Sequence, residues 1–139
     1  MPKVERDGLY RGKGGVYVRQ GALLLIEAFS KNRIECSEDA IWRHVKTLND
    51  GLKYAQEEVQ DFAVPAFREF CKAYLAEPTS RLSKMIERWC EEITKEQAIA
   101  QCRGYGRALG ALTAPVIIND LKLIVDSLIK RSRQAVKIL

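Results

Sequence analysis

The stretch that decides the fold runs from Val59 to Leu75 and reads VQDFAVPAFREFCKAYL. Its large apolar residues recur at steps of three and four, which places them on one side of an α-helix. A stripe this wide must be covered by other parts of the chain, so we expect this helix to lie at the centre of the fold. The stripe consists of Phe62, Ala63, Ala66, Phe67, Phe70, Cys71, Tyr74 and Leu75.

The chain repeats the pattern of this helix on both sides of it. A shift of 41 residues aligns Gln20, Ala22, Leu25, Ile26 and Phe29 with Asp61, Ala63, Ala66, Phe67 and Phe70. A further shift of 42 aligns that second set with Arg103, Tyr105, Ala108, Leu109 and Leu112. Helix pairs that recur every ~40–47 residues are typical of HEAT and armadillo arrays. The sequence therefore predicts an all-α fold, an α-solenoid of HEAT-like antiparallel helix pairs.

About six helices are expected, with no strand between them. Because the links are short, neighbouring helices should run antiparallel. Ser37 is the predicted N-cap of the second helix and Asp61 that of the third, which would place Pro65 in the early turns. The whole chain, 1–139, is predicted to be one segment with a loop at 1–15 and helices at 16–31, 37–55, 59–76, 79–95, 96–112 and 114–133.

Local features also predict how the helices pack. The five apolar residues from Ala22 to Ile26 suggest that both flanks of the first helix are buried. Gly104, Gly106 and Gly110 each lower helix propensity by about 1 kcal/mol, so we expect them where a neighbouring helix comes close. The array begins and ends in mid-repeat, which predicts apolar end faces and a segment cut from a longer protein.

Composition predicts a soluble, cytosolic domain. The chain has 139 residues, 47% of them hydrophobic and 29% charged, and a net charge of +5. No apolar run approaches the ~18–20 residues that span a bilayer, and the N-terminus lacks the apolar core of a secretory signal. The positive charge permits an acidic protein or a nucleic acid as partner, although solvated helical domains often carry such a charge.

The residue types that carry metal and enzyme chemistry form no pattern here. The four cysteines include no CxxC pair, so we expect buried, reduced thiols and neither a metal site nor a disulfide. The single histidine, His44, has no evident acid–base partner and is interpreted as a residue at the edge of an apolar stripe. The sequence therefore predicts no catalytic residues and no cofactor.

The candidate functional residues are charged side chains on the first, third and fifth predicted helices. In HEAT-type arrays the inner helices line a concave surface that binds partners. A charge near a helix start can instead pair with the adjacent repeat. The candidates for partner contact, or for plain solvation, are Arg68, Lys72 and Arg107. Those expected to join adjacent repeats are Arg19, Asp61 and Arg103.

Three runs of the chain form a recognisable set: LYRGKGGVYVRQGA (9–22), the central helix (59–75) and CRGYGRALGAL (102–112). Together they resemble the tubulin-folding cofactor D family of HEAT-repeat chaperones. The family has a YRGxGG segment followed by VRQ, which this chain carries at 10–15 and 18–20. Arg103 is an additional residue between Cys102 and Gly104 and departs from the family pattern.

The resemblance implies a fragment of a far longer cytoplasmic solenoid, associated with microtubules or centrosomes. Its implied partners are β-tubulin, the other tubulin-folding cofactors and an ADP-ribosylation-factor-like small GTPase. Such chaperones assemble and dismantle the αβ-tubulin heterodimer. GTP hydrolysis in their complexes occurs on tubulin, stimulated by the assembled cofactors, so the segment itself needs no catalytic residue.

Two other interpretations stay open. A generic HEAT scaffold could bind transport cargo or nucleic acid, although the chain has no dense Lys/Arg stripe interleaved with aromatic residues. An enzyme could use the segment RGKGG (11–15) to bind a nucleotide. That segment lacks the Ser or Thr after its lysine, and the preceding strand, that a phosphate-binding loop requires.

Overall fold

The computed structural model describes residues 12–95 and 98–138 and, within them, the side chains of 14–95 and 98–134. This part of the chain is all-helical and contains no strand. The helices are α2 (Gly12–Lys31), α3 (Glu38–Leu52), α4 (Glu57–Tyr74), α5 (Ser80–Lys95), α6 (Ile99–Ala111), α7 (Ala114–Asn119) and α8 (Leu121–Ile138). None of them is both long and apolar enough to cross a lipid bilayer.

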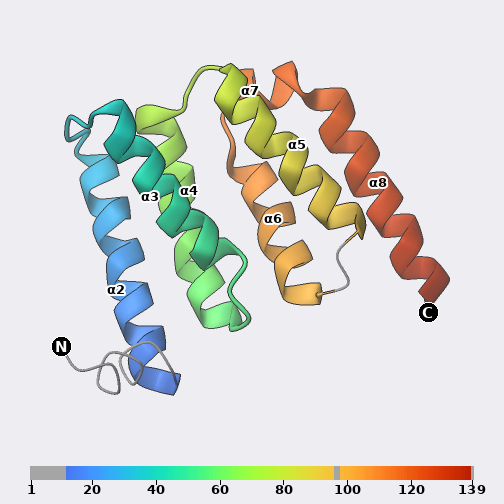
Figure 1. Cartoon of the computed structure of the whole chain (residues 1–139), viewed down its shortest axis with the longest axis horizontal. Coiled ribbons are helices and arrows are strands. Elements are labelled where there is room, and N and C mark those ends of the chain that lie inside the picture. Colours follow the sequence, from blue (N-terminus) through green and yellow to red (C-terminus); the bar gives the residue numbers. More distant parts are fainter. Residues whose placement is uncertain (1–11, 96–97, 139) are drawn as a thin grey trace.

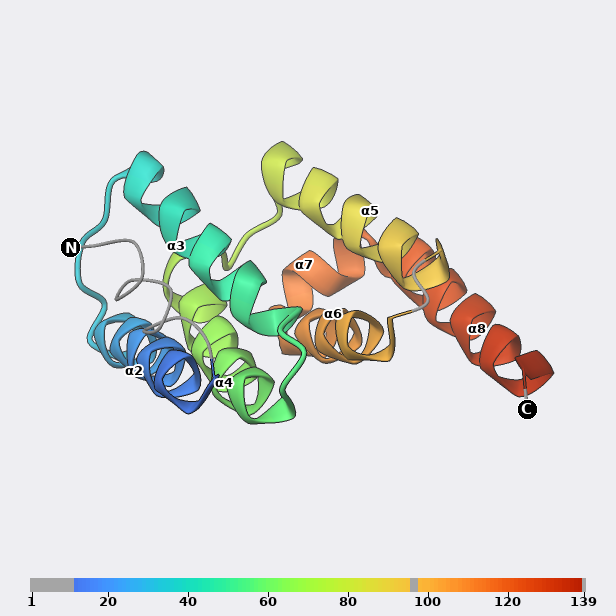
Figure 2. The same cartoon turned by 60° about the horizontal axis from the view of Figure 1, so that its bottom comes forward.

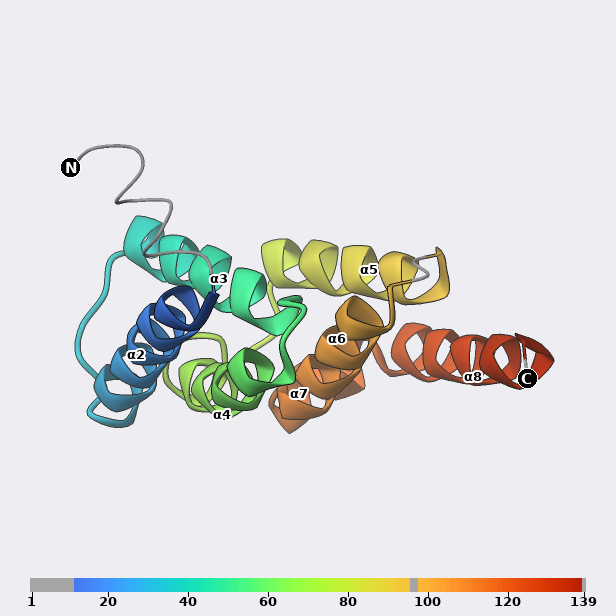
Figure 3. The same ribbon diagram turned by 90° about the horizontal axis from the view of Figure 1, so that it is seen from below.

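The helices form two layers, which Figure 2 shows one above the other. The first layer contains α2, α4 and α6, and the second contains α3 and α5, while α8 packs against α5 at one end of the molecule and lies level with α6 in Figure 2. In Figure 1 the first-layer helices run from the bottom of the view to the top, and the second-layer helices run the opposite way. Within the first layer, α4 packs against both α2 and α6. In all three views α2 and α8 lie at opposite ends of the molecule, as Figure 3 shows from below.

The core lies between the two layers, and α4 supplies its centre. The predicted stripe of α4 is confirmed, with Phe67 and Phe70 fully buried. The Phe67 ring lies 5.4 Å from that of Trp89 on α5, which in turn stacks at 5.3 Å on Tyr105 of α6. The Trp89 indole also donates a 2.9 Å hydrogen bond to Asn49 on α3. These aromatic contacts tie four helices around one cluster.

Hydrogen bonds between distant helices recur at about the period that the sequence predicts. Gln20 donates to the carbonyl of Glu58 at 3.4 Å, and Gln60 donates to that of Ala100 at 2.6 Å. Among the described residues, the side-chain hydrogen bonds that join distant segments span 36 to 46 positions. α2 is therefore bonded to α4, and α4 to α6, the next helix of the same layer.

Two predicted helix starts are wrong. Residues 12–15, assigned to a loop, form the first turn of α2, where burial of Gly15 and Val16 offsets the low helix propensity of glycine. The rest of that predicted loop, 1–11, lies outside the described residues. The helix predicted to start at an Asp61 cap starts at Glu57 instead, because burial of Val59 and Gln60 fixes the preceding turn. Pro65 therefore lies in the interior of α4.

The helix predicted at 114–133 is two helices. Asp120 separates α7 from α8: its N–H bonds to the Ile117 carbonyl, and its own carbonyl accepts from Ile124 N–H at 3.0 Å. The Asp120 carboxylate accepts a 3.1 Å hydrogen bond from Ser83 on α5. This bond fixes the junction between α7 and α8 against α5. In the sequence, Asn119 and Asp120 indicate this break between two helices, because both residue types favour turns and caps over helix interiors. The first two residues of the predicted helix 96–112 lie outside the described residues.

The packing predictions are correct only in part. A Cβ on Gly104 would lie 1.6 Å from the Leu52 carbonyl oxygen, so the predicted close approach is confirmed there. Gly106 and Gly110 have no neighbouring atom within 4 Å of such a Cβ, so for them the prediction is wrong. The prediction that both flanks of the first helix are buried is also wrong, because Leu25 is 69% exposed.

Large apolar residues on α6 and α8 are exposed. Ile99, at the start of α6, is 74% exposed, and Leu121 and Leu128 on α8 are also exposed. No other helix of the described chain packs over these positions closely enough to cover them. Leu24 and Leu25 on α2 are exposed as well, so large apolar side chains are uncovered at both ends of the layered structure.

The cysteines are free thiols. Cys71 and Cys90 are buried, as predicted, whereas Cys36 and Cys102 are half-buried. Burial raises the pKa of both Cys71 and Cys90 above that of an ordinary thiol. These two thiols therefore stay protonated at neutral pH and act as small apolar side chains.

Candidate partner-binding surfaces

Gln60 is the polar centre of the first layer. It is fully buried at the start of α4, and its amide nitrogen donates to the carbonyls of Tyr54 at 2.9 Å and Ala100 at 2.6 Å. Its amide oxygen accepts a 2.7 Å hydrogen bond from Arg103. The α3–α4 link, α4 and α6 thus meet at one side chain. Gln60 was not predicted from the sequence, where the available signal was a polar amide between Val59 and the apolar stripe.

Two arginines of α6 reach across to α4. Arg103, besides its bond to Gln60, lies 4.0 Å from a Glu57 carboxylate oxygen. Arg107 forms a 2.8 Å ion pair with Asp61. The structure therefore places Arg107, a candidate for partner contact, in the same inter-helix contact as Asp61 and Arg103. The Arg107 guanidinium remains partly exposed, so the pair lies at the surface of the layer.

Arg19 makes a different contact. Its guanidinium carbon lies 4.7 Å from the centre of the Tyr54 ring, a cation–π geometry. Tyr54 is also the residue whose carbonyl binds Gln60. The α3–α4 link therefore connects the Arg19 contact with the Gln60 contact, and these side chains hold the three first-layer helices in register.

Arg68 and Lys72 form the exposed cationic part of α4. They lie four residues apart, so they occupy the same side of the helix. Lys72 forms a 3.2 Å ion pair with Glu69, and its backbone carbonyl accepts a 2.8 Å hydrogen bond from Arg33. Arg68 is exposed and makes no ion pair with the described residues. The exposed surface around Arg68 and Lys72 can thus attract an acidic group without first breaking a buried contact.

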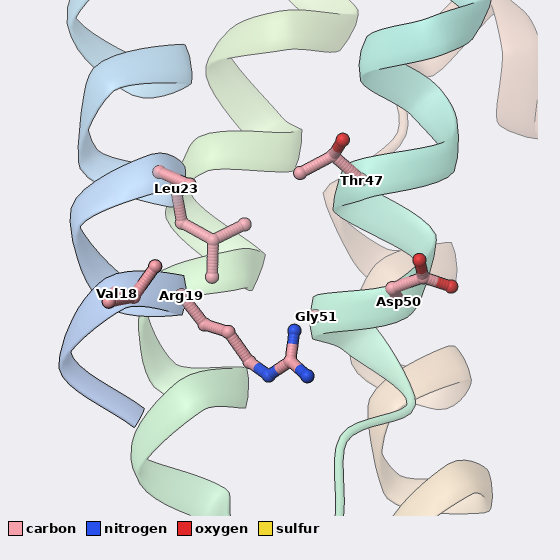
Figure 4. A pocket seen from close by; sticks show the side chains of 7 residues that line it. Val18, Arg19, Leu23, Thr47, Asp50 and Gly51 are labelled. Atoms are coloured by element: carbon pink, nitrogen blue, oxygen red, sulfur yellow. The ribbon is translucent and has the colours of Figure 1, made fainter. Parts of the chain in front are cut away.

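A shallow pocket of about 310 Å³ lies between α2 and α3. Figure 4 shows Arg19 reaching toward Gly51 across the pocket, while the Asp50 carboxylate points away from it. The lining residues are Val18, Arg19, Ala22, Leu23, Thr47, Asp50 and Gly51. They include no histidine, cysteine or carboxylate pair that could perform acid–base chemistry.

His44 packs as part of an aromatic cluster. Its ring lies 5.0 Å from that of Phe29 and 6.3 Å from that of Phe70. Burial lowers the pKa of His44, and the neighbouring positive charge of Arg43 lowers it further. The histidine is therefore neutral at neutral pH and acts as a packing residue among aromatic rings.

No metal-binding cluster of three or more His, Cys, Asp or Glu residues occurs within 12–95 and 98–138. The glycine-rich segment considered for nucleotide binding overlaps this range only at 12–15, where the backbone is helical. The rest of the YRGxGG run, including Tyr10 and Arg11, lies outside the described residues.

No protein-family model matches this chain, and no solved structure matches it. The assignment of a function therefore depends on the three sequence runs and on the surfaces described above.

Proposed function

We propose that this chain is a module of stacked HEAT-like helix pairs that binds a protein partner and performs no reaction of its own. Support comes from the layering: helices run parallel within each layer and antiparallel between layers. Contacts pass from α2 to α4 and from α4 to α6, and the two end helices lie far apart. A closed bundle would bring its first and last helices together, whereas an open array leaves its faces free for partners.

The partner that we propose is β-tubulin, with the chain acting as a segment of a tubulin-folding chaperone of the cofactor D kind. Within the described residues, the three runs that resemble this family fall on α2, α4 and α6 and on the residues that directly follow α4 and α6. Residues of these runs also make the contacts that hold the first layer: Arg19, Asp61 and Arg103. The family resemblance and the best-connected part of the fold therefore coincide.

In this proposal the module supports assembly and dismantling of the αβ-tubulin heterodimer in the cytoplasm. The other tubulin-folding cofactors and an ADP-ribosylation-factor-like small GTPase would be the further members of the complex. GTP would be hydrolysed on tubulin, and this module would contribute rigid surface to the assembled cofactors that stimulate the reaction.

The observation that carries the choice of surface is the exposed guanidinium of Arg68, which lies beside Lys72 and makes no ion pair with any residue that the structure describes. Arg107, the third candidate, is already paired with Asp61. A long-lived contact with an acidic protein surface would therefore use Arg68 first, together with Lys72 beside it, whose own ion pair is with Glu69 of the same helix. Because both groups are exposed, the contact should weaken as the salt concentration rises.

The test is capture of purified β-tubulin by the immobilised 139-residue chain. The double variant Arg68→Glu, Lys72→Glu should capture at least about tenfold less tubulin, because repulsion replaces two attractive pairs. The matched control is Lys46→Glu, Lys84→Glu, which makes the same charge change at exposed positions of the second layer. Equal loss in both variants would show a general charge effect, and full capture by the first variant would show that this surface is not the contact.

A further inference from the structure

Exposed cations gather on α3 and α5, the two helices of the second layer. Five of them form no ion pair with the residues that the structure describes: Arg43, Lys46, Arg81, Lys84 and Arg88. On the first-layer helices, most of the comparable side chains already pair with carboxylates, namely Lys31, Lys72, Arg103 and Arg107. The second layer therefore presents positive charge that is available to a partner.

Two contacts between α3 and α5 bring these cations onto one surface. The guanidinium carbon of Arg81 lies 4.3 Å from the centre of the Trp42 ring, and the Trp89 indole bonds to Asn49 at 2.9 Å. Lys46 comes four residues after Trp42 and three before Asn49, so it shares the side of α3 that meets α5. Figures 1 and 2 both show the two helices side by side.

The remaining cations extend this surface along both helices. Arg81, Lys84 and Arg88 recur at steps of three and four, so they share one side of α5. Arg43 lies three residues before Lys46, on an adjoining part of α3. The step from Arg81 to Arg88 covers about 10 Å of helix, at about 1.5 Å per residue. We call these five side chains the cationic surface.

Trp42 holds Arg81 in an orientation that suits a carboxylate. The Trp42 N–H donates to a Glu38 carboxylate oxygen at 3.0 Å, which fixes the indole, and the Arg81 guanidinium packs on its ring. A guanidinium that is stacked on a ring keeps the N–H donors at its edge free, and these donors match the two oxygens of a carboxylate. Because the ring already orients Arg81, binding a carboxylate there loses less side-chain entropy.

The chemistry of the cationic surface favours an extended acidic peptide over a nucleic acid. Single-stranded nucleic acids bind by stacking their bases on aromatic rings. α3 and α5 contribute no exposed large apolar residue, and Trp42 is half-buried with Arg81 on its ring. An extended peptide rises about 3.3 Å per residue, so about three or four acidic residues span the distance from Arg81 to Arg88.

We propose that the cationic surface of α3 and α5 binds an extended acidic segment of a partner protein, with one of its carboxylates on the Arg81 guanidinium. The contact lies on the other layer from Arg68 and Lys72, so it is separate from the proposed contact with β-tubulin and does not depend on it. Because all five cations are exposed, binding should weaken as the salt concentration rises.

The test is fluorescence anisotropy of a labelled hexaglutamate peptide, titrated with the full chain at low salt. Wild type should bind the peptide. Lys46→Glu, Lys84→Glu should weaken binding at least about tenfold, because repulsion replaces two attractive pairs. The matched control is Arg68→Glu, Lys72→Glu, which makes the same charge change on α4. It should bind like wild type, because Lys72 is already paired with Glu69 and the peptide finds more cations on the second layer. Circular dichroism checks that each variant folds.

A second comparison tests the role of Arg81 itself. Arg81→Lys keeps the positive charge but loses the planar set of donors, so it should weaken peptide binding at least about threefold. Arg88→Lys makes the same change at a side chain that has no ring contact within the described chain, and its effect should be smaller. Equal effects of the two variants would overturn the role given to Arg81.

Three results would overturn the proposal as a whole. They are no binding of hexaglutamate by wild type at low salt, equal losses in the two double variants, and tighter binding of a single-stranded oligothymidylate that Lys46→Glu, Lys84→Glu abolishes. The last result would assign the cationic surface to a nucleic acid. The double variants also separate this inference from the proposed function. Lys46→Glu, Lys84→Glu should lose the peptide and keep β-tubulin, whereas Arg68→Glu, Lys72→Glu should do the reverse.

Discussion

The Nε of Arg103 on α6 donates a 2.7 Å hydrogen bond to the side-chain oxygen of Gln60, which is fully buried at the start of α4. The same amide binds two backbone carbonyls through its nitrogen. The Gln60 side chain thus joins the α3–α4 link, the start of α6 and the Arg103 cation at the contact between first-layer helices.

Replacing Gln60 should be costly. Gln60→Leu removes three hydrogen bonds and leaves the Arg103 guanidinium without its closest acceptor, so we expect a loss of about 3 kcal/mol in the free energy of unfolding. Urea denaturation followed by tryptophan fluorescence measures this loss. Gln56→Leu is the matched control, because Gln56 is exposed and its side chain makes no cap hydrogen bond. Similar losses in both variants would contradict the role of Gln60.

The three glycines of α6 should respond in opposite ways to alanine. Gly104→Ala places a Cβ 1.6 Å from the Leu52 carbonyl oxygen, so helices α3 and α6 must move apart, at a cost of at least about 3 kcal/mol. Gly110→Ala meets open space and should stabilise the helix by about 0.5–1 kcal/mol, as should Gly106→Ala. Thermal unfolding of the three variants compares them. An unaffected Gly104→Ala variant would show that the helices do not approach this closely.

The Asp61–Arg107 pair should contribute little to stability despite its 2.8 Å distance. Its two side chains are 56% and 37% exposed, and exposed pairs contribute about 0.2–1 kcal/mol. A double-mutant cycle with Asp61→Ala and Arg107→Ala measures the coupling, which should fall as salt is added. A coupling well above this range that salt leaves unchanged would indicate a desolvated pair.

Stability should depend on the ionisation of His44. Because the pKa of the folded-state histidine is lowered, the unfolded chain binds a proton more readily as the pH falls through the ordinary value of 6.5. The contribution of neutral His44 is therefore fully present above pH 6.5 and is lost as the pH falls toward the folded-state pKa. His44→Gln should be less sensitive than wild type when denaturation is compared at about pH 7.5 and about pH 5.5. Since His44 is the only histidine, equal pH dependence in both proteins would refute the prediction.

The helices and much of the core were predictable because they follow from local periodicity. The apolar residues of α5, for example, fall on one side of the helix and are all buried: Leu82, Ile86, Trp89, Cys90 and Ile93. Ser37 caps α3 as predicted, and its hydroxyl accepts from the Ala40 N–H. Apolar spacing and capping depend on residues close in sequence, so the chain itself contains this information.

The candidate site was less predictable. The sequence does not distinguish Arg68 from Arg103 and Arg107. In the structure, Arg103 and Arg107 of α6 bond to α4, while Arg68 is exposed. Gln60 was missed because its three partners lie on other segments. Periodicity gives the side of a helix that a residue occupies but not which neighbouring group it meets.

The sequence by itself determined an all-helical chain, the period of its helices and the stripes that face inward, because each depends on backbone preference and local spacing. The tertiary structure decided which apolar stripes remain exposed, which glycine has no room for a side chain and which arginines bond to a neighbouring helix. Leu25 and Phe67 belong to equally apolar stripes, yet one is 69% exposed and the other fully buried. That difference depends on whether another helix lies beside them, and only the arrangement of helices in space supplies it.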